Sequence, residues 1–121
     1  MSTALVVEDS MTDMQVISNC LKQGGLNVLT ADSSEEALVK INNHQPDVIV
    51  LDVVLPGRSG FELCRDLKSE AQTRKIPIVI CSTKSGEMDK FWGMKQGADA
   101  YIGKPIDQDE LIRTVKQLIK R

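Results

Sequence analysis

The run Val48-Ile49-Val50-Leu51-Asp52 consists of four consecutive apolar residues followed by a carboxylate. A strand with one face in water alternates polar and apolar residues, whereas a parallel strand covered by helices on both faces is apolar throughout. The run Ile78-Val79-Ile80 has the same character. Both runs therefore predict buried strands of a parallel sheet.

Strands and helices are expected to alternate along the chain. Short apolar or β-branched runs, which are typical of strands, occupy residues 4–7, 28–31, 47–51, 76–81 and 100–102. Segments with helical spacing lie between them, and the plausible N-caps are Ser10 (with Asp13 three residues later), Ser33 or Ser34, Ser85 and Asp107. The last segment has the clearest apolar stripe, formed by Leu111, Val115 and Leu118. Gly24-Gly25 and Gly97 predict left-handed ends for the first and fourth helices.

This order of elements predicts the fold class. Five β-α units in succession favour an α/β fold: a doubly wound, five-stranded parallel sheet with helices on both faces and right-handed crossovers. A length of 121 residues suits one domain spanning residues 1–121. Such folds bind ligands at the carboxyl ends of their strands.

Composition excludes several classes of protein. Apolar residues make up 41% of the chain and charged residues 26%, as in soluble globular proteins. The 15 Lys and Arg and 17 Asp and Glu residues form no sustained run, which argues against a nucleic-acid partner. There is neither a signal peptide nor an apolar stretch of the ~20 residues that a membrane span needs, so we expect no membrane partner and a cytoplasmic location. Cys20, Cys64 and Cys81 show no CxxC pattern and are expected to be buried, reduced thiols.

Polar side chains follow four of the predicted strands where each strand ends: Glu8-Asp9, Asp52, Ser82-Thr83 and Lys104-Pro105. The carboxyl ends of parallel strands share one edge of a sheet, so these groups are expected to meet in one shallow pocket. Three adjacent carboxylates repel one another unless a cation intervenes, and Mg²⁺ is the hard divalent ion that such a site favours. Asp9, Asp52 and the backbone carbonyl of Val54 would suffice as ligands, with Glu8 holding a coordinated water. Lys104, Ser82 and the Thr83 N–H are candidates to meet the charge of a phosphoryl group.

Four separated motifs give the sequence a family resemblance: Glu8-Asp9, residues 51–60 (LDVVLPGRSG), Ser82-Thr83 and residues 101–105 (YIGKP). In this order they resemble the CheY-like receiver domains of two-component systems, over essentially the whole chain. The resemblance implies a flavodoxin-like (βα)5 topology. It also implies that Asp52 is the phospho-acceptor, Glu8 and Asp9 the acidic metal pair, Ser82 the switch hydroxyl, Tyr101 the switch aromatic and Lys104 the lysine that contacts phosphate. The bond between Lys104 and Pro105 would be cis, as in that family.

The function implied is that of a stand-alone response regulator in a phosphorelay. Such a protein is a phospho-acceptor switch with Mg²⁺-dependent self-phosphorylation and autodephosphorylation, rather than an enzyme for an external substrate. Residues 82–98 are most similar to the receivers of chemosensory systems that govern type IV pili and twitching motility. This implies a CheA-like histidine kinase or phosphotransfer domain as donor, and a protein target on the face of the fourth helix, fifth strand and fifth helix.

Several interpretations stay open at this point. The helical spacing of Met88, Phe91, Trp92 and Met94 favours core or half-buried packing over a partner-binding patch. Val54 stands two residues after Asp52 and its side chain cannot assist an attacking water, which favours a long-lived phosphorylated state. The rival functions are an aspartate-based phosphatase, although such enzymes generally carry a second Asp where this chain has Val54, and an interaction module that works without phosphorylation.

Overall fold

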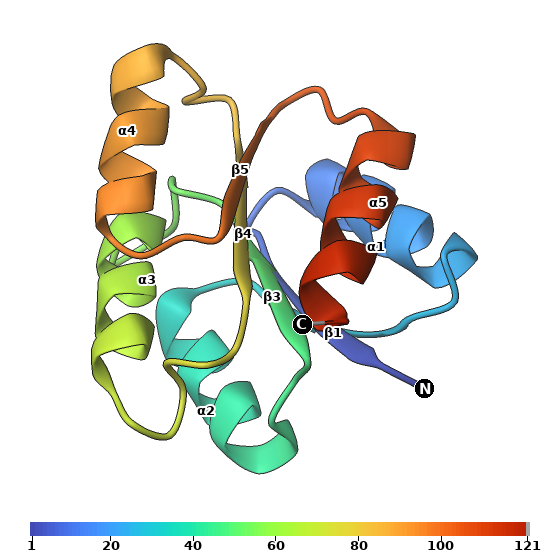
Figure 1. Cartoon of the computed structure of the whole chain (residues 1–121), viewed down its shortest axis with the longest axis horizontal. Helices are drawn as coiled ribbons and strands as arrows, with labels where there is room; N and C mark the ends of the chain where they lie inside the picture. Colours follow the sequence, from blue (N-terminus) through green and yellow to red (C-terminus); the bar gives the residue numbers. More distant parts are fainter. Residues whose placement is uncertain (121) are drawn as a thin grey trace.

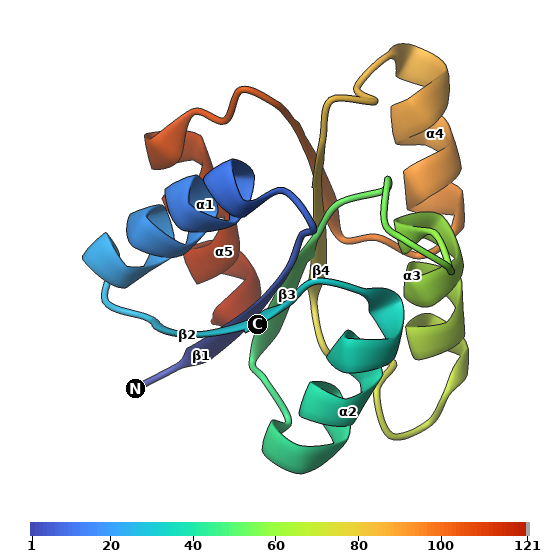
Figure 2. The same ribbon diagram turned by 180° about the vertical axis from the view of Figure 1, so that it is seen from behind.

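The computed structural model describes residues 1–120 and shows a parallel sheet of five strands between two layers of helices (Figure 1). The strands are β1 (Thr3–Val7), β2 (Asn27–Ala31), β3 (Val48–Leu51), β4 (Ile78–Ser82) and β5 (Ala100–Gly103). The helices are α1 (Met11–Gln23), α2 (Ser34–His44), α3 (Gly60–Ser69), α4 (Glu87–Lys95) and α5 (Gln108–Ile119). The strand order is β2-β1-β3-β4-β5. Helices α1 and α5 cover one face and α2, α3 and α4 the other, as Figure 1 and Figure 2 show from opposite sides. The predicted doubly wound α/β fold is confirmed.

Successive residues of each central strand contribute to two different cores. In β3, Ile49 and Leu51 belong to the core that includes residues of α2 and α3, whereas Val48 and Val50 belong to the core with α1 and α5. The alternation follows from the two-residue period of a strand. Because both faces are covered, neither set needs polar side chains, and the sequence of β3 is apolar without interruption.

Three of the predicted helix caps are confirmed. The side chains of Ser10, Ser33 and Asp107 accept hydrogen bonds from the backbone N–H three residues later, at 3.3, 3.1 and 3.2 Å. Ser34 instead is buried and donates to the carbonyl oxygen of Arg58 at 2.8 Å. The left-handed ends predicted for α1 and α4 are present at Gly25 (φ +91°) and Gly97 (φ +103°).

The strands differ from the prediction by one or two residues at their ends, and the starts of β4 and α4 differ for clear physical reasons. Strand β4 begins at Ile78 rather than Ile76, because Pro77 has no N–H for the sheet and the Ile76 N–H donates to the carbonyl of Thr73 in a turn, at 3.0 Å. Helix α4 follows Gly86 rather than Ser85, and the expected hydroxyl cap is wrong. A glycine has no side chain to cap with, and the Gly86 N–H donates to Asp89 Oδ2 at 3.2 Å.

The four large apolar side chains of α4 are exposed to solvent, so core packing is wrong for them, although Phe91, Trp92 and Met94 are close to half-buried. Met88, Phe91, Trp92 and Met94 are 77%, 55%, 53% and 48% exposed. The helix meets the sheet through Gly93, its only buried residue. A Cβ atom at Gly93 would lie 2.7 Å from two ring carbons of Tyr101, so the tyrosine ring occupies the space beneath the helix.

The expectations for the cysteines and for Pro105 are confirmed. Cys20, Cys64 and Cys81 are buried and free. The Lys104-Pro105 peptide bond is cis. Among residues 1–120, no helix combines the length and apolar character needed to cross a bilayer.

Candidate functional site

The predicted strand ends meet at one edge of the sheet. The parallel register pairs residues near the carboxyl ends of neighbouring strands: Val7 with Leu51, Leu51 with Ile80, and Ser82 with Gly103. Backbone hydrogen bonds continue past the strands, from the Asp52 N–H to the Val7 carbonyl and from the Lys104 N–H to the Ser82 carbonyl, both at 3.0 Å. The backbone itself therefore places Asp52 and Lys104 at this edge.

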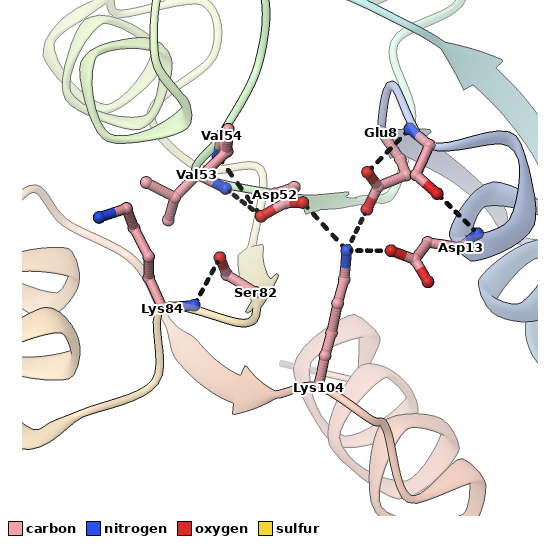
Figure 3. A network of polar contacts seen from close by, with 9 residues as sticks. Glu8, Asp13, Asp52, Val53, Val54, Ser82, Lys84 and Lys104 are labelled. Carbon is pink, nitrogen blue, oxygen red and sulfur yellow. Dashed lines mark hydrogen bonds and ion pairs between the residues drawn. The ribbon is translucent and has the colours of Figure 1, made fainter.

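The Lys104 ammonium lies at the centre of a group of carboxylates (Figure 3). Its Nζ is 2.5 Å from Glu8 Oε1, 2.9 Å from Asp13 Oδ2 and 3.0 Å from Asp52 Oδ2. The side chain of Lys104 is 8% exposed. One ammonium among three carboxylates leaves the group with excess negative charge.

The environment separates the pKa values of the two buried carboxyls. Burial raises the pKa of Glu8, and the opposing contacts with Lys104 and a backbone N–H do not bring it back to its ordinary value. Burial also raises the pKa of Asp52, but the Ser82 hydroxyl, the Lys104 ammonium and a backbone N–H outweigh burial and leave that pKa below its ordinary value. Asp52 is therefore an anion at neutral pH, as a nucleophilic carboxylate must be.

Backbone groups hold the second oxygen of Asp52. Its Oδ1 accepts from the N–H of Val53 at 2.6 Å and is 3.5 Å from the N–H of Val54. Gly60, at the start of α3, packs against the main chain of Asp52: a Cβ there would lie 1.9 Å from the Asp52 carbonyl oxygen. The sequence suggested only a turn residue at Gly60, whereas the structure makes it part of the support of Asp52.

Ser82 and Tyr101 connect the site to the loop between β4 and α4. Ser82 is buried, and its Oγ accepts from the Lys84 N–H at 3.2 Å. The Tyr101 hydroxyl donates to the Lys84 carbonyl oxygen. Burial raises the pKa of Tyr101 to about 12, so this hydroxyl keeps its proton at neutral pH. The two predicted switch residues thus bond to the same residue of one loop.

Three other predicted site residues are more exposed. Asp9 follows the buried Glu8, but its own side chain is exposed and makes no ion pair within residues 1–120. Thr83 is exposed beside Ser82. Val54 is 54% exposed, so an apolar side chain stands in the solvent next to Asp52.

The donor set fits Mg²⁺. Glu8 and Asp52 already converge on one cation, Asp9 offers a carboxylate without an ion-pair partner, and the Val54 carbonyl accepts no backbone hydrogen bond among residues 1–120. All are hard oxygen donors. Across the same residues no three acidic, histidine or cysteine side chains form a cage for a metal by themselves. Mg²⁺ does not need such a cage, because it retains several waters and commonly uses one or two carboxylates.

Asp13 belongs to the site although the sequence suggested only a capping role for it. Its carboxylate binds Lys104 rather than the start of its own helix. The sequence signal is an acidic residue five positions after Glu8, in the first turn of α1, and the structure places its side chain toward the strand ends. Capping preference alone gives no reason to aim that carboxylate at a lysine 91 residues away.

Comparison with known proteins agrees with this geometry. Residues 4–116 match the model of the response regulator receiver domain, and the chain belongs to that family. It is 37% identical to protein PilH of Pseudomonas aeruginosa over 98% of both chains. It spans about half the length of several transcriptional regulatory proteins that it also matches.

Solved structures show the same fold. The crystal structure of a response regulator from Chloroflexus aurantiacus has a TM-score of 0.95 to this chain at 33% sequence identity. The match covers 99% of this chain and 98% of the Chloroflexus chain. The receiver domain of the sensor histidine kinase PA1611 from Pseudomonas aeruginosa, at 24% identity, has a TM-score of 0.90 over 99% and 98% of the two chains. That structure carries a magnesium ion in its active site cleft.

Proposed function

We propose that the protein is a stand-alone response regulator of a phosphorelay and that Asp52 is its phospho-acceptor. The observation that carries the proposal is the state of Asp52. Its carboxylate is nine-tenths buried, is kept ionised by its neighbours, and has one oxygen on backbone N–H groups and the other 3.0 Å from Lys104. The similarity to PilH, 37% identical over 98% of both chains, supports the role of a response regulator.

The chemistry follows from the neighbours of Asp52. An Asp52 carboxylate oxygen attacks the phosphorus of a phosphohistidine on the donor protein. A new O–P bond forms while the P–N bond breaks, and the electron pair of the broken bond passes to the leaving imidazole nitrogen. Negative charge on the equatorial oxygens is met by the Lys104 ammonium, the Ser82 hydroxyl and the Thr83 N–H.

Mg²⁺ is the cofactor that this site would hold, through Asp9, Asp52 and the Val54 carbonyl, with Glu8 on a coordinated water. When bound, it would neutralise charge on the phosphoryl oxygens. Two observations support the assignment: the excess negative charge around Lys104, and the magnesium in the cleft of the related PA1611 receiver.

Phosphorylation would be read out through the loop between β4 and α4. A phosphoryl oxygen that draws in the Ser82 hydroxyl disturbs its bond with the Lys84 N–H, and Tyr101 is bonded to the same residue. The ring of Tyr101 in turn supports α4 at Gly93. The altered face of α4, β5 and α5 would bind a downstream protein, with the exposed side chains of α4 as its apolar part.

The donor would be a CheA-like histidine kinase or a phosphotransfer domain, and the process the control of type IV pili or twitching motility in the cytoplasm. This pathway rests on the resemblance of residues 82–98 to receivers of pilus chemosensory systems and on the similarity to PilH. A nucleic acid is not proposed as a partner, because the basic residues form no sustained run along the chain.

The test is phosphorylation by acetyl phosphate with Mg²⁺, followed by intact-mass measurement. The wild type is expected to gain one phosphoryl group, and Asp52→Asn none, because an amide is a poor nucleophile. Asp32→Asn, which changes an exposed carboxylate at the same sheet edge, is the matched control and should behave as wild type. Full labelling of Asp52→Asn would refute the site. Steady turnover of p-nitrophenyl phosphate would instead favour the phosphatase alternative.

A further inference from the structure

Asp13 makes an unexpected contact for its position in α1. It is the third residue of the helix, where an acidic side chain commonly accepts a hydrogen bond from the N–H of the capping residue. The Asp13 N–H does donate to Ser10 Oγ at 3.3 Å, but the Ser10 N–H donates to Glu8 Oε2 at 3.2 Å. Asp13 Oδ2 lies 2.9 Å from Lys104 Nζ, as Figure 3 shows. The carboxylate therefore serves the site rather than its own helix.

The three N–H bonds of the Lys104 ammonium are all used. An ammonium has three donors, and Glu8, Asp13 and Asp52 each take one. A phosphoryl group on Asp52 that is to be contacted by Lys104 needs one of these donors. The donor that Asp52 takes can pass to the phosphoryl group that Asp52 then carries, and a second donor, which the added negative charge favours, must be drawn from Glu8 or Asp13.

Burial decides which carboxylate is released. The side chains of Glu8 and Asp52 are 2% and 9% exposed, whereas that of Asp13 is 41% exposed. A buried carboxylate that loses its cation stays unsolvated, while an exposed one is taken up by water, which makes its release less costly. Asp13 and Lys104 also border a hollow of about 160 Å³ beside Ile106.

We propose that Asp13 is a positioning residue: it holds Lys104 in the unphosphorylated protein and yields it to the phosphoryl group on Asp52. This inference rests on the proposed function. Asp13 opposes phosphorylation in two ways, because its contact with Lys104 is lost and because its charge repels the incoming group. The acidic side chain of Asp13 therefore lowers the affinity of Asp52 for a phosphoryl group.

The test is calorimetric titration of the protein with beryllofluoride, a phosphoryl mimic, in the presence of Mg²⁺. At low salt, Asp13→Asn is expected to lower the Kd about three- to fivefold, the range of one partly exposed ion pair, and the gain should shrink as salt screens the charges. Asp13→Glu, which keeps the charge, should stay near wild type. Asp32→Asn is the control for long-range charge and should change the Kd less than about twofold.

A second measurement needs neither metal nor phosphoryl mimic. The NMR signals of the Lys104 ammonium should shift in Asp13→Asn and keep their wild-type positions in Asp32→Asn. An unchanged or higher Kd for Asp13→Asn, in a protein whose wild type binds beryllofluoride, overturns the role of Asp13 alone. Absence of beryllofluoride binding by the wild type would count against the proposed function itself.

Discussion

Replacing Gly60 with alanine separates two effects that predict opposite signs. Gly60 is the first residue of α3, and helix propensity alone favours alanine over glycine by about 1 kcal/mol. The added Cβ, however, would lie 1.9 Å from the Asp52 carbonyl oxygen, 2.8 Å from the Asp52 carbonyl carbon and 2.6 Å from Leu51 Cδ1. Two of these atoms are main chain and cannot swing aside as a flexible side chain would.

The magnitude follows from this geometry. Overpacking by one methyl group costs about 1–3 kcal/mol where neighbours can adjust, and here the neighbours are the backbone of a central strand. Because main-chain atoms cannot adjust, we expect Gly60→Ala to cost about 4 kcal/mol, which the gain of about 1 kcal/mol in propensity reduces to a net loss of about 3 kcal/mol in the free energy of unfolding. With an m-value of about 2 kcal/mol per molar urea, the midpoint would fall by about 1.5 M. Urea unfolding followed by far-UV circular dichroism measures both quantities.

The matched control is Gly86→Ala at the start of α4. A Cβ at Gly86 would meet only Asp89 Oδ2, at 3.5 Å, so its effect should be that of a changed cap, within about 1 kcal/mol. Gly60→Ala should also slow phosphorylation, because its clash displaces the residue that carries the nucleophile. A Gly60→Ala protein as stable as wild type, or more so, would refute the argument from close packing.

Three further predictions concern charge, timing and pH. Lys104→Met leaves Glu8 and Asp52 buried without their cation, so the free energy of unfolding measured in urea should fall by about 3 kcal/mol. Added Mg²⁺ should restore part of this stability. Equal effects of Mg²⁺ and Na⁺ at matched ionic strength would contradict the prediction. Val54→Asn places an amide beside Asp52, where it can orient an attacking water. The half-time of phospho-Asp52 should therefore shorten several-fold in a phosphate-release assay. An unchanged half-time would show that Val54 does not slow the hydrolysis of phospho-Asp52. Burial raises the pKa of the Cys64 thiol from 9.0 to about 11, so the folded state keeps a proton that the unfolded state loses: stability is full below about pH 9 and declines toward pH 11 by up to about 1.4 kcal/mol per pH unit. Cys64→Ala should flatten that alkaline decline in urea unfolding, and an identical pH profile for the variant would exclude this thiol.

The fold was predictable because each level of the sequence pointed the same way. Apolar runs without alternation at β3 and β4 indicated helices on both faces, the order of elements favoured a doubly wound parallel sheet, and the family resemblance implied its topology. The shared sheet edge was predictable too, since the carboxyl ends of parallel strands meet regardless of detail. This placed Glu8, Asp52, Ser82 and Lys104 together correctly.

What the sequence did not reveal depends on where side chains point. Glu8 and Asp9 are adjacent acids in the sequence, and nothing in the pattern tells which one is buried. Asp13 reads as a helix cap until the end of β5 brings Lys104 within reach of it. The apolar residues of α4 have helical spacing, yet Gly93 and the ring of Tyr101 fill the contact with the sheet and turn them outward.

Helix α4 is therefore the least firmly attached helix of the fold. It buries only Gly93, whereas α5, for example, buries Leu111, Val115 and Leu118. Apolar area removed from water is the main force that fixes an element in place, so a small displacement of α4 forfeits little of it. A rearrangement of the loop between β4 and α4 can therefore re-orient α4 at a small cost in free energy. A protein that binds and covers the methionines and aromatic rings of α4 can offset that cost.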